Sequence, residues 1–347
     1  MTMMGFLSDL HMTDKWIDEP HWDLFPQVDA IIDKHNLTEL YFLGDLTTAI
    51  DRHPARLLNR LLDGLVALST KVEKMVFLHG NHDGKTNDTA YFRLLRHIPK
   101  FRYYTEPDCE EIDGVMYVYL PHSRNPKADW ADLDLNNTFV MTHVTLDKAK
   151  AESGVRVDGE IDAAFFRDTR LALSGDIHLP QIMGRVVYVG SPYNVRFGDN
   201  FDGSMLILDS TKLKEDADNC WFREPLVFPR KLSVEVKNAY QVEAYLTDFE
   251  RDHRAKAQVK VKLKVDQSNI ESWQQIRHEI EQVVAKHGHT HIDTEVEQQW
   301  KTPVSTEQRH QESGAVEADS FEDFCEAQGV NDKLKAAGLR IMAEAKK

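Results

Sequence analysis

Long apolar runs are missing from this sequence of 347 residues, and their absence excludes one class of protein. No stretch of about 18 consecutive apolar residues occurs, so we expect no membrane span. The first residues also lack a basic stretch followed by an apolar one, and we therefore expect no signal peptide.

Cysteine is scarce as well. The three cysteines, Cys109, Cys220 and Cys325, are odd in number and lie far apart in the sequence. This spacing argues against a disulfide framework and against a zinc site built from thiolates. Few unpaired cysteines are typical of a reducing compartment, so we expect a cytoplasmic protein.

A surplus of basic residues is absent too. The chain has 42 lysines and arginines against 57 aspartates and glutamates, which gives a formal net charge of −15. Proteins that coat nucleic acid without regard to sequence rely on Lys and Arg against phosphate, and this balance argues against that class. A nucleic-acid enzyme with a local basic surface stays open, because metal ions in a cleft would supply positive charge.

What the sequence does contain is the pattern of an α/β protein that is long enough for two domains. Strand-like and helix-like stretches alternate over the first hundred residues, and strand-like stretches dominate afterwards. The pattern resets near Pro229, and residues 259–265 alternate strictly between apolar residues and lysine. We predict a first domain over residues 1–229, a small α/β domain over 230–298, a flexible linker over 299–319 and C-terminal helices over 320–347.

One predicted helix begins near Pro54 and carries a wide apolar stripe. Its leucines occur at helical spacing from Leu57 to Leu68. Packing against a sheet is the simpler interpretation of this stripe, and a subunit interface is the alternative.

Five strand-like runs end in polar residues of the kinds that bind metal ions. The runs cover residues 4–8, 40–43, 75–78, 138–142 and 171–174. In open α/β sheets the ligand crevice lies outside the carboxyl ends of the strands, so we expect these polar residues to share one cleft. They are Asp9, His11, Asp45, Asn81, His82, His143, Asp176 and His178.

The mixture of carboxylate, amide oxygen and imidazole suits a first-row divalent ion such as manganese, iron or zinc. The set is too large for one ion, whereas two ions about 3.5–4 Å apart would use all of it and would clamp a phosphoryl group. Asp45 has the central position that a bridging carboxylate needs. No Gly-x-Ser-x-Gly motif and no P-loop occurs, so the sequence offers no obvious protein nucleophile, and a bridging water is expected to attack phosphorus.

The order of these motifs resembles that of the calcineurin-like metallophosphoesterase superfamily. The most specific motif is Gly80-Asn81-His82-Asp83, and the set extends from Asp9 to His178. A Gly190-Ser191-Pro192 turn, a separate small α/β domain and C-terminal helices narrow the resemblance to the SbcD-type nuclease subunit of double-strand-break-repair nucleases, bacteriophage versions included. The resemblance implies a metallophosphoesterase β-sandwich core flanked by helices, with the small domain as a cap.

The resemblance also implies a role for each residue of the cleft. His82 would face the scissile phosphate and stabilise or protonate the leaving oxygen, and Asp83 would orient His82. The other residues would hold two ions, most simply Mn²⁺. Asp9, His11 and His178 would bind one ion, Asn81, His143 and Asp176 the other, and Asp45 would bridge them.

Two positions depart from the family pattern. The family usually has Gly-His-x-His where this chain has Gly175-Asp176-Ile177-His178. Asp can still bind a metal ion, and it adds negative charge at the second ion. The family also often carries a His three residues after the bridging Asp, and Thr48 occupies that position here, which puts a role of that His in positioning DNA ends in doubt.

The implied function is a two-metal DNA nuclease subunit, acting as an exonuclease, a single-strand endonuclease or both, in recombination and repair within a bacterial or phage-infected cell. The implied partners are DNA, an SbcC-like ATPase bound by the C-terminal helices, and a second copy of the chain. Lys260, Lys262 and Lys264 would contact DNA phosphates, or form an ordinary solvent face. The alternatives are a phosphatase or cyclic-nucleotide phosphodiesterase, and a degenerate scaffold that no longer cleaves.

Overall fold

The computed structural model describes residues 2–253, 255–265 and 272–298, and Met1–Gln298 form one compact unit. The predicted linker (299–319) and the predicted C-terminal helices (320–347) lie outside the described residues. Within the described ranges, no helix is long and apolar enough to cross a membrane.

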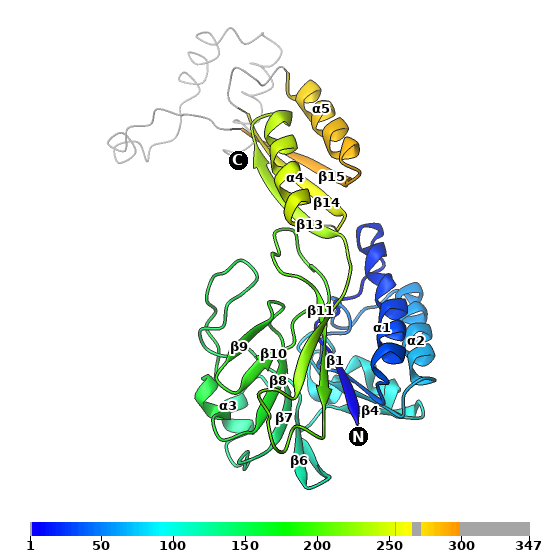
Figure 1. Ribbon diagram of the computed structural model, residues 1–347, viewed down its shortest axis with the longest axis vertical. Coiled ribbons are helices and arrows are strands. Elements are labelled where there is room, and N and C mark those ends of the chain that lie inside the picture. Colours follow the sequence, from blue (N-terminus) through cyan, green and yellow to red (C-terminus); the bar gives the residue numbers. More distant parts are fainter. Residues whose placement is uncertain (1, 254, 266–271, 299–347) are drawn as a thin grey trace, which may run out of the picture. The chain divides into compact units, whose positions relative to one another are not determined.

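Two six-stranded sheets form the larger part of the described chain (Figure 1). The first sheet has the order β12-β11-β1-β2-β3-β4, in which β1 to β4 are parallel. Its strands are β1 (Met3–Leu7), β2 (Glu39–Phe42), β3 (Lys74–Leu78), β4 (Phe101–Tyr104), β11 (Ser204–Asp209) and β12 (Trp221–Pro225).

The second sheet has the order β5-β6-β7-β8-β10-β9, in which β6, β7, β8 and β10 are parallel. Parallel strands need long crossover connections, so each strand of this run is followed by a loop at its carboxyl end. The strands are β5 (Asp108–Ile112), β6 (Val115–Leu120), β7 (Phe139–His143), β8 (Leu171–Gly175), β9 (Gln181–Met183) and β10 (Val186–Tyr188).

The inner strands of the first sheet, β1, β2, β3 and β11, are buried on both faces, which explains why they are apolar runs rather than alternating ones. Phe6 and Tyr41 face the second sheet, where Phe6 meets Phe139 edge-on at a ring-centroid distance of 6.1 Å. Leu7 and Phe42 face the opposite way, toward α1 (Leu24–His35) and α2 (Ala55–Ser69). The sandwich of two mixed sheets flanked by helices confirms the predicted fold class.

The apolar stripe of α2 packs into this helical layer. Leu57, Leu61, Leu65 and Leu68 are all buried in the core between α1, α2 and the first sheet. The packing interpretation of the stripe is therefore confirmed for these four leucines. The other helices before Pro229 are short: η1 (Trp16–Asp23), η2 (Asn87–Thr89), η3 (Tyr91–His97), α3 (Pro126–Asp129) and η4 (Ala163–Phe166).

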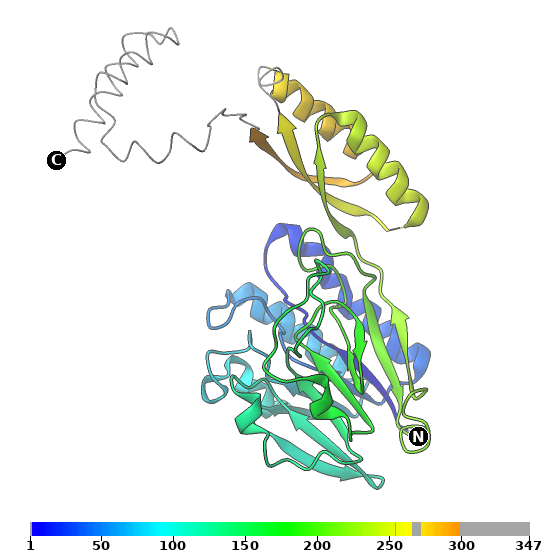
Figure 2. The same cartoon turned by 90° about the vertical axis from the view of Figure 1, so that its left-hand side faces the viewer.

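A third sheet follows Pro229 and has its own core. Its three parallel strands have the order β13-β14-β15, and Figure 2 shows two helices on one face of it. Val259, Val261 and Leu263 are buried against these helices, as their alternation with lysine predicts. The sequence did not indicate the first strand. The elements are β13 (Arg230–Val236), α4 (Ala239–Asp252), β14 (Ala257–Val265), α5 (Trp273–Lys286) and β15 (Thr290–Gln298).

Candidate metal centre

The polar residues predicted to share one cleft do come together in the structure. The first sheet supplies the loops after β1, β2 and β3, and the second sheet supplies the end of β7 and the loop after β8. The carboxyl ends of parallel strands from both sheets therefore meet at one place. The residues gathered there are Asp9, His11, Asp45, Asn81, His82, His143, Asp176 and His178.

Four of these residues have a left-handed backbone. The φ angles are 54° at Asp9, 43° at His11, 59° at Asp45 and 83° at Asp176. Such a conformation costs a non-glycine residue on the order of 1–3 kcal/mol and persists only where the surroundings enforce it. Here the loops hold one another, since the N–H of Asp9 donates to the Gly44 carbonyl (3.1 Å) and the N–H of His11 to the Asp45 carbonyl (3.0 Å). Strain of this kind concentrates at functional sites.

Two glycines of the motifs are required by close packing inside the cleft. A Cβ atom on Gly44, whose φ is +95°, would lie 2.3 Å from Nδ1 of His143. A Cβ atom on Gly80 would lie 2.3 Å from Oδ1 of Asp45. In the Gly-Asp and Gly-Asn-His-Asp motifs, the glycine therefore leaves room for a side chain of the cleft. The polar residues that follow it can bind a metal ion.

Asp9, His11 and His178 form what we call the first half of the cleft. All three are buried, and Nε2 of His11 lies 3.0 Å from Nε2 of His178. Within the described ranges, Oδ2 of Asp9 has no hydrogen-bond partner, although it is buried. At most one proton can lie between these two imidazole nitrogens, and the carboxylate oxygen beside them has no hydrogen-bond donor in the part of the chain that the structure describes. A divalent cation would satisfy all of them.

Asn81, His143 and Asp176 form the second half of the cleft. Nε2 of His143 lies 3.0 Å from the side-chain amide of Asn81 and 3.6 Å from Oδ1 of Asp176. Asp45 lies between the halves, with Oδ2 3.5 Å from Nε2 of His11 and Oδ1 3.6 Å from Nε2 of His143. This is the placement that the bridging carboxylate predicted from the sequence would need.

His82 lies beside both His11 and Asp45. Its ring meets the His11 ring edge-on at a centroid distance of 4.9 Å, and it groups with His11 and Asp45 as a third donor of ligand atoms. Its Nδ1 lies 2.9 Å from the backbone carbonyl of Thr48. Because a carbonyl only accepts, Nδ1 must carry the proton of this hydrogen bond. Nε2 is then the ring nitrogen that can act on another group.

The role predicted for Asp83 is corrected by the structure. Its buried carboxylate accepts hydrogen bonds from three backbone N–H groups, at 2.9 Å from Asp45, 3.0 Å from Leu46 and 2.8 Å from Gly80. These bonds leave Asp83 turned toward the backbone, and the carbonyl of Thr48 orients His82 instead. Asp83 therefore fixes the loop that carries Asp45, and this loop delivers the carboxylate to the centre of the cleft.

Burial and mutual repulsion govern the protonation of the carboxylates and imidazoles. Burial raises the pKa of Asp9 and of Asp45, and Asp83 and Asp9 raise that of Asp45 further. Burial also lowers the pKa of His11 well below its usual value. At His143 burial opposes the charged form, but the carboxylates of Asp45, Asp176 and Asp9 outweigh it and raise the pKa to about 9. The cleft thus attracts positive charge strongly.

These residues fit a pair of divalent ions. The donors are carboxylate oxygens and imidazole nitrogens with one amide, and they include no thiolate, which suits first-row divalent metals. Asp9, His11 and His178 bring their ligand atoms within 4.8 Å of one another, and Asp45 does so both with His11 and His82 and with Asp9 and His143. Cations would also offset the negative charge that the buried carboxylates gather, which their raised pKa values show to be costly.

Two further contacts of the cleft carry no signal in the sequence. Oε1 of Glu152 lies 3.0 Å from Nδ1 of His178, and the hydroxyl of Thr145 donates to Oδ2 of Asp176. The contact with His178, despite partial burial, lowers the pKa of Glu152 to about 2. A carboxylate behind a histidine fixes its ring orientation, so Nε2 of His178 is directed into the cleft. Glu152 and Thr145 lie in polar stretches of the sequence that match no motif, so their contacts become visible only in the structure.

The predicted DNA-binding lysines lie on β14 and are paired with acidic residues. The ammonium groups of Lys260 and Lys262 lie 3.8 Å from Glu295 and 3.7 Å from Glu235, and that of Lys264 lies 2.5 Å from Glu235. Since each lysine has a glutamate beside it, this face presents little net positive charge. The contact of these lysines with DNA stays a prediction that the structure does not support.

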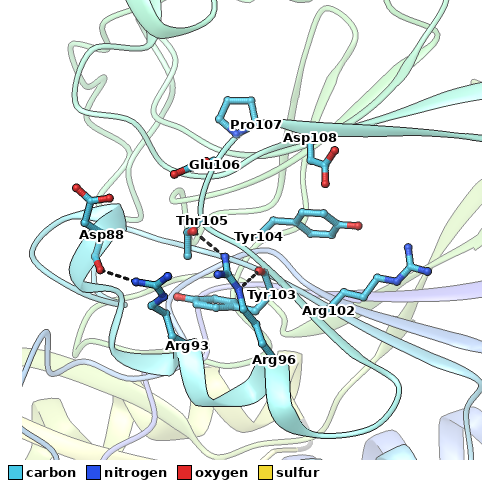
Figure 3. Close-up of a pocket in the computed structure, with 10 residues that line it drawn as sticks. All are labelled: Asp88, Arg93, Arg96, Arg102, Tyr103, Tyr104, Thr105, Glu106, Pro107 and Asp108. Carbon is cyan, nitrogen blue, oxygen red and sulfur yellow. Dashed lines mark hydrogen bonds between the residues drawn. The ribbon is translucent and has the colours of Figure 1, made fainter.

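A cavity of about 800 Å³ lies on the side of η3 and β4, and no residue of the cleft lines it (Figure 3). Its arginines already have partners. Arg93 donates to the carbonyl of Asp88, whereas Arg96 donates to the carbonyl of Tyr103 and the hydroxyl of Thr105. Acidic side chains line the same cavity, so its size alone does not make it a second reaction site.

The residues of the cleft lie within a match to a known protein family. The family model described as calcineurin-like phosphoesterase matches residues 4–208, which include every residue of the cleft. Among solved structures, a novel archaeal phosphodiesterase is similar over 65% of this chain and 100% of its own, with 15% identity and a TM-score of 0.35. A dimetal phosphatase from Danio rerio is similar over 60% of this chain and 92% of its own, with 11% identity and a TM-score of 0.39. No curated protein matches the chain.

Proposed function

The chain belongs to the calcineurin-like phosphoesterase family, which consists of metal-dependent hydrolases, and we propose that it is a two-metal nuclease that hydrolyses phosphodiester bonds in DNA. The observation that carries this proposal is the position of Asp45 between two sets of ligand atoms, with His82 at their edge. When bound, two divalent ions would polarise the phosphate and provide a nucleophilic water near neutral pH.

The protein residues have separate tasks in this reaction. The first half of the cleft would hold one ion, the second half the other, and Asp45 both. The Thr48 carbonyl keeps the Nδ1 proton of His82 in place, so that the imidazolium form carries its second proton on Nε2 and can donate that proton to the leaving oxygen. Asp83 acts through the backbone, because its hydrogen bonds from the N–H groups of Asp45 and Leu46 hold the Asp45 loop in its left-handed conformation.

DNA is proposed as the substrate on two grounds. The Gly190-Ser191-Pro192 turn and the small domain that follows it resemble those of SbcD-type nuclease subunits. The family match ends at residue 208, and the third sheet with its own core lies beyond it, although hydrolysis of a small phosphate ester needs no such addition. The same resemblance supports manganese as the metal, a homodimer and an SbcC-like ATPase partner. Loss of ATPase binding on deletion of residues 301–347 would test the last of these.

The test is a nuclease assay on end-labelled single- and double-stranded DNA with manganese, magnesium or a chelator. We expect manganese-dependent cleavage, and His82→Ala should lower its rate by about a hundredfold or more while the protein still binds manganese. The matched control is His97→Ala, because His97 is exposed on η3 and lies outside the cleft.

Three outcomes would contradict parts of this proposal. If His82→Ala cleaved DNA at the wild-type rate, His82 would have no role in the reaction. Hydrolysis of para-nitrophenyl phosphate without cleavage of DNA would favour the phosphatase alternative. Fewer than one manganese ion per chain at saturation would favour a scaffold that no longer cleaves.

A further inference from the structure

Two cavities open from the second half of the cleft and share Asn81 and Arg124 in their walls. One has a volume of about 360 Å³ and reaches Asp176, and the other has a volume of about 260 Å³ and reaches Lys85. A substrate whose phosphate lies at Asn81 therefore has two directions in which the rest of its chain can leave the cleft.

The walls of the smaller cavity are held together by hydrogen bonds between two loops. The N–H of His122 donates to the carbonyl of His79 at 2.7 Å, and the guanidinium of Arg124 donates to the carbonyl of Lys85. The segment after β6 is in this way tied to the segment after β3, which carries Asn81 and His82. Arg124 is therefore positioned relative to the cleft before any substrate arrives.

The charges of the two cavities differ. Asp158, Glu160 and Asp176 all line the larger one, so a phosphate group would meet like charge there. The acidic residue of the smaller cavity is Asp129, whose carboxylate accepts from the Ser123 hydroxyl. The smaller cavity is the favourable exit for a polyanion.

Arg124 has the donors that a phosphate group needs. Its guanidinium carries five N–H donors, and the bond to the Lys85 carbonyl uses one end of the fork. Among residues 2–253, 255–265 and 272–298, no carboxylate forms an ion pair with Arg124, whereas the ammonium of Lys85 lies 2.6 Å from Asp51. Arg124 is thus a cation without an ion-pair partner among the described residues, in a cavity that begins at the reacting centre.

We propose that Arg124 binds a non-scissile phosphate of the substrate, next to the phosphate that is cleaved. The substrate class is then a phosphodiester chain with at least two phosphates, such as an oligonucleotide. A phosphate monoester or a cyclic nucleotide has only one phosphate, and with that group in the cleft it leaves nothing for Arg124 to bind. This inference rests on the proposed nuclease function and names the group that recognises the strand.

The test compares two substrates in the full-length protein with manganese: an oligothymidylate, and bis(para-nitrophenyl) phosphate, which has a single phosphate. Arg124→Ala should lower the ratio of kcat/KM for the first to that for the second by about tenfold, the loss of one charge-assisted hydrogen bond. The dependence of log KM on log salt for the oligonucleotide should also weaken by about 0.7, the share of one phosphate contact on a single strand.

Lys127→Ala is the matched control, because Lys127 is an exposed cation on α3, three residues after Arg124, and lines neither cavity. It should keep both the ratio and the salt dependence of the wild type. Arg124→Lys keeps the charge and should retain the salt dependence, which separates a phosphate contact from a role in tying the two loops.

A ratio and a salt dependence in Arg124→Ala that equal those of the wild type would overturn the inference while the nuclease proposal stands. So would an Arg124→Lys variant that loses the salt dependence as Arg124→Ala does. A wild-type protein that hydrolyses neither substrate with manganese would overturn the proposed function and this inference with it.

Discussion

The cleft and the third sheet both contain many charged side chains, but they arrange them in opposite ways. In the cleft, Asp9 and Asp45 are 0% and 2% exposed and lie near one another, and the pKa of each is raised. On the third sheet, Lys262 and Glu235 are 41% and 51% exposed and form a pair of opposite charges.

This difference separates charges that serve a ligand from charges that serve the fold. Burying a charge without a partner is costly, whereas an exposed pair contributes only about 0–1 kcal/mol. The paired residues of the third sheet need no ligand to offset their charges. The buried carboxylates of the cleft are destabilising until cations arrive, so the two regions should respond differently to substitution and to metal.

The largest effect is expected from Asp45→Asn. The substitution removes the carboxylate that lies between both halves of the cleft, so nuclease activity should fall by about a thousandfold or more, and fewer than two manganese ions should bind per chain. The metal-free variant should nevertheless be more stable than the metal-free wild type by about 1 kcal/mol, because one buried like charge is gone. Cleavage rates, metal analysis and thermal unfolding measure the three quantities.

Asp63→Asn is the control for this experiment, since Asp63 is exposed on α2. It should change none of the three quantities. If metal-free Asp45→Asn were less stable than the metal-free wild type, the carboxylates of the cleft would not destabilise the fold.

Manganese should raise the stability of the protein, and more so at high pH. Binding at a hundred times the dissociation constant contributes about 2.7 kcal/mol per site. Without metal, the pKa of His143 is about 9, because the carboxylate of Asp45 and its neighbours outweigh burial. A histidine whose pKa is raised on folding contributes stability below about pH 6.5 that is lost as the pH rises toward 9. Thermal unfolding at pH 6.5 and 8.5, with manganese or chelator, should show this loss only in the chelated protein.

A smaller effect is expected from Glu152→Gln. Glutamine keeps the shape of the side chain but loses the charge that holds Nδ1 of His178, so manganese affinity should fall by about tenfold. Titration of the metal-free protein with manganese measures this affinity. Glu73→Gln, at an exposed position, is the control. Unchanged affinity in Glu152→Gln would mean that the fold alone orients His178.

The cleft could be predicted largely from the sequence because each candidate ligand lies at or soon after the carboxyl end of an apolar strand, and parallel strands place their carboxyl ends together. The contacts of Glu152 and of Asp83 could not. Each depends on which loops lie side by side, as in the 3.0 Å contact between Glu152 and His178, whose partners are far apart in the chain. On the third sheet the alternation of residues 259–265 predicted the strand and its lysine face. The glutamates beside the lysines depend on the register with β13 and β15, which the pattern of one strand does not contain.

The smallest effect is expected from replacing Lys260, Lys262 and Lys264 together by glutamine. Their partners Glu235 and Glu295 would lose exposed ion pairs, so the free energy of unfolding should fall by only about 1 kcal/mol or less. Because those glutamates already offset the charge of the lysines, KM for an oligonucleotide and its salt dependence should stay within about twofold of the wild-type values. Glu235→Gln should leave both quantities within the same range. A large rise in KM together with a weaker salt dependence would instead place DNA on this face, and the contrast between an inert sheet and a ligand-dependent cleft would no longer hold.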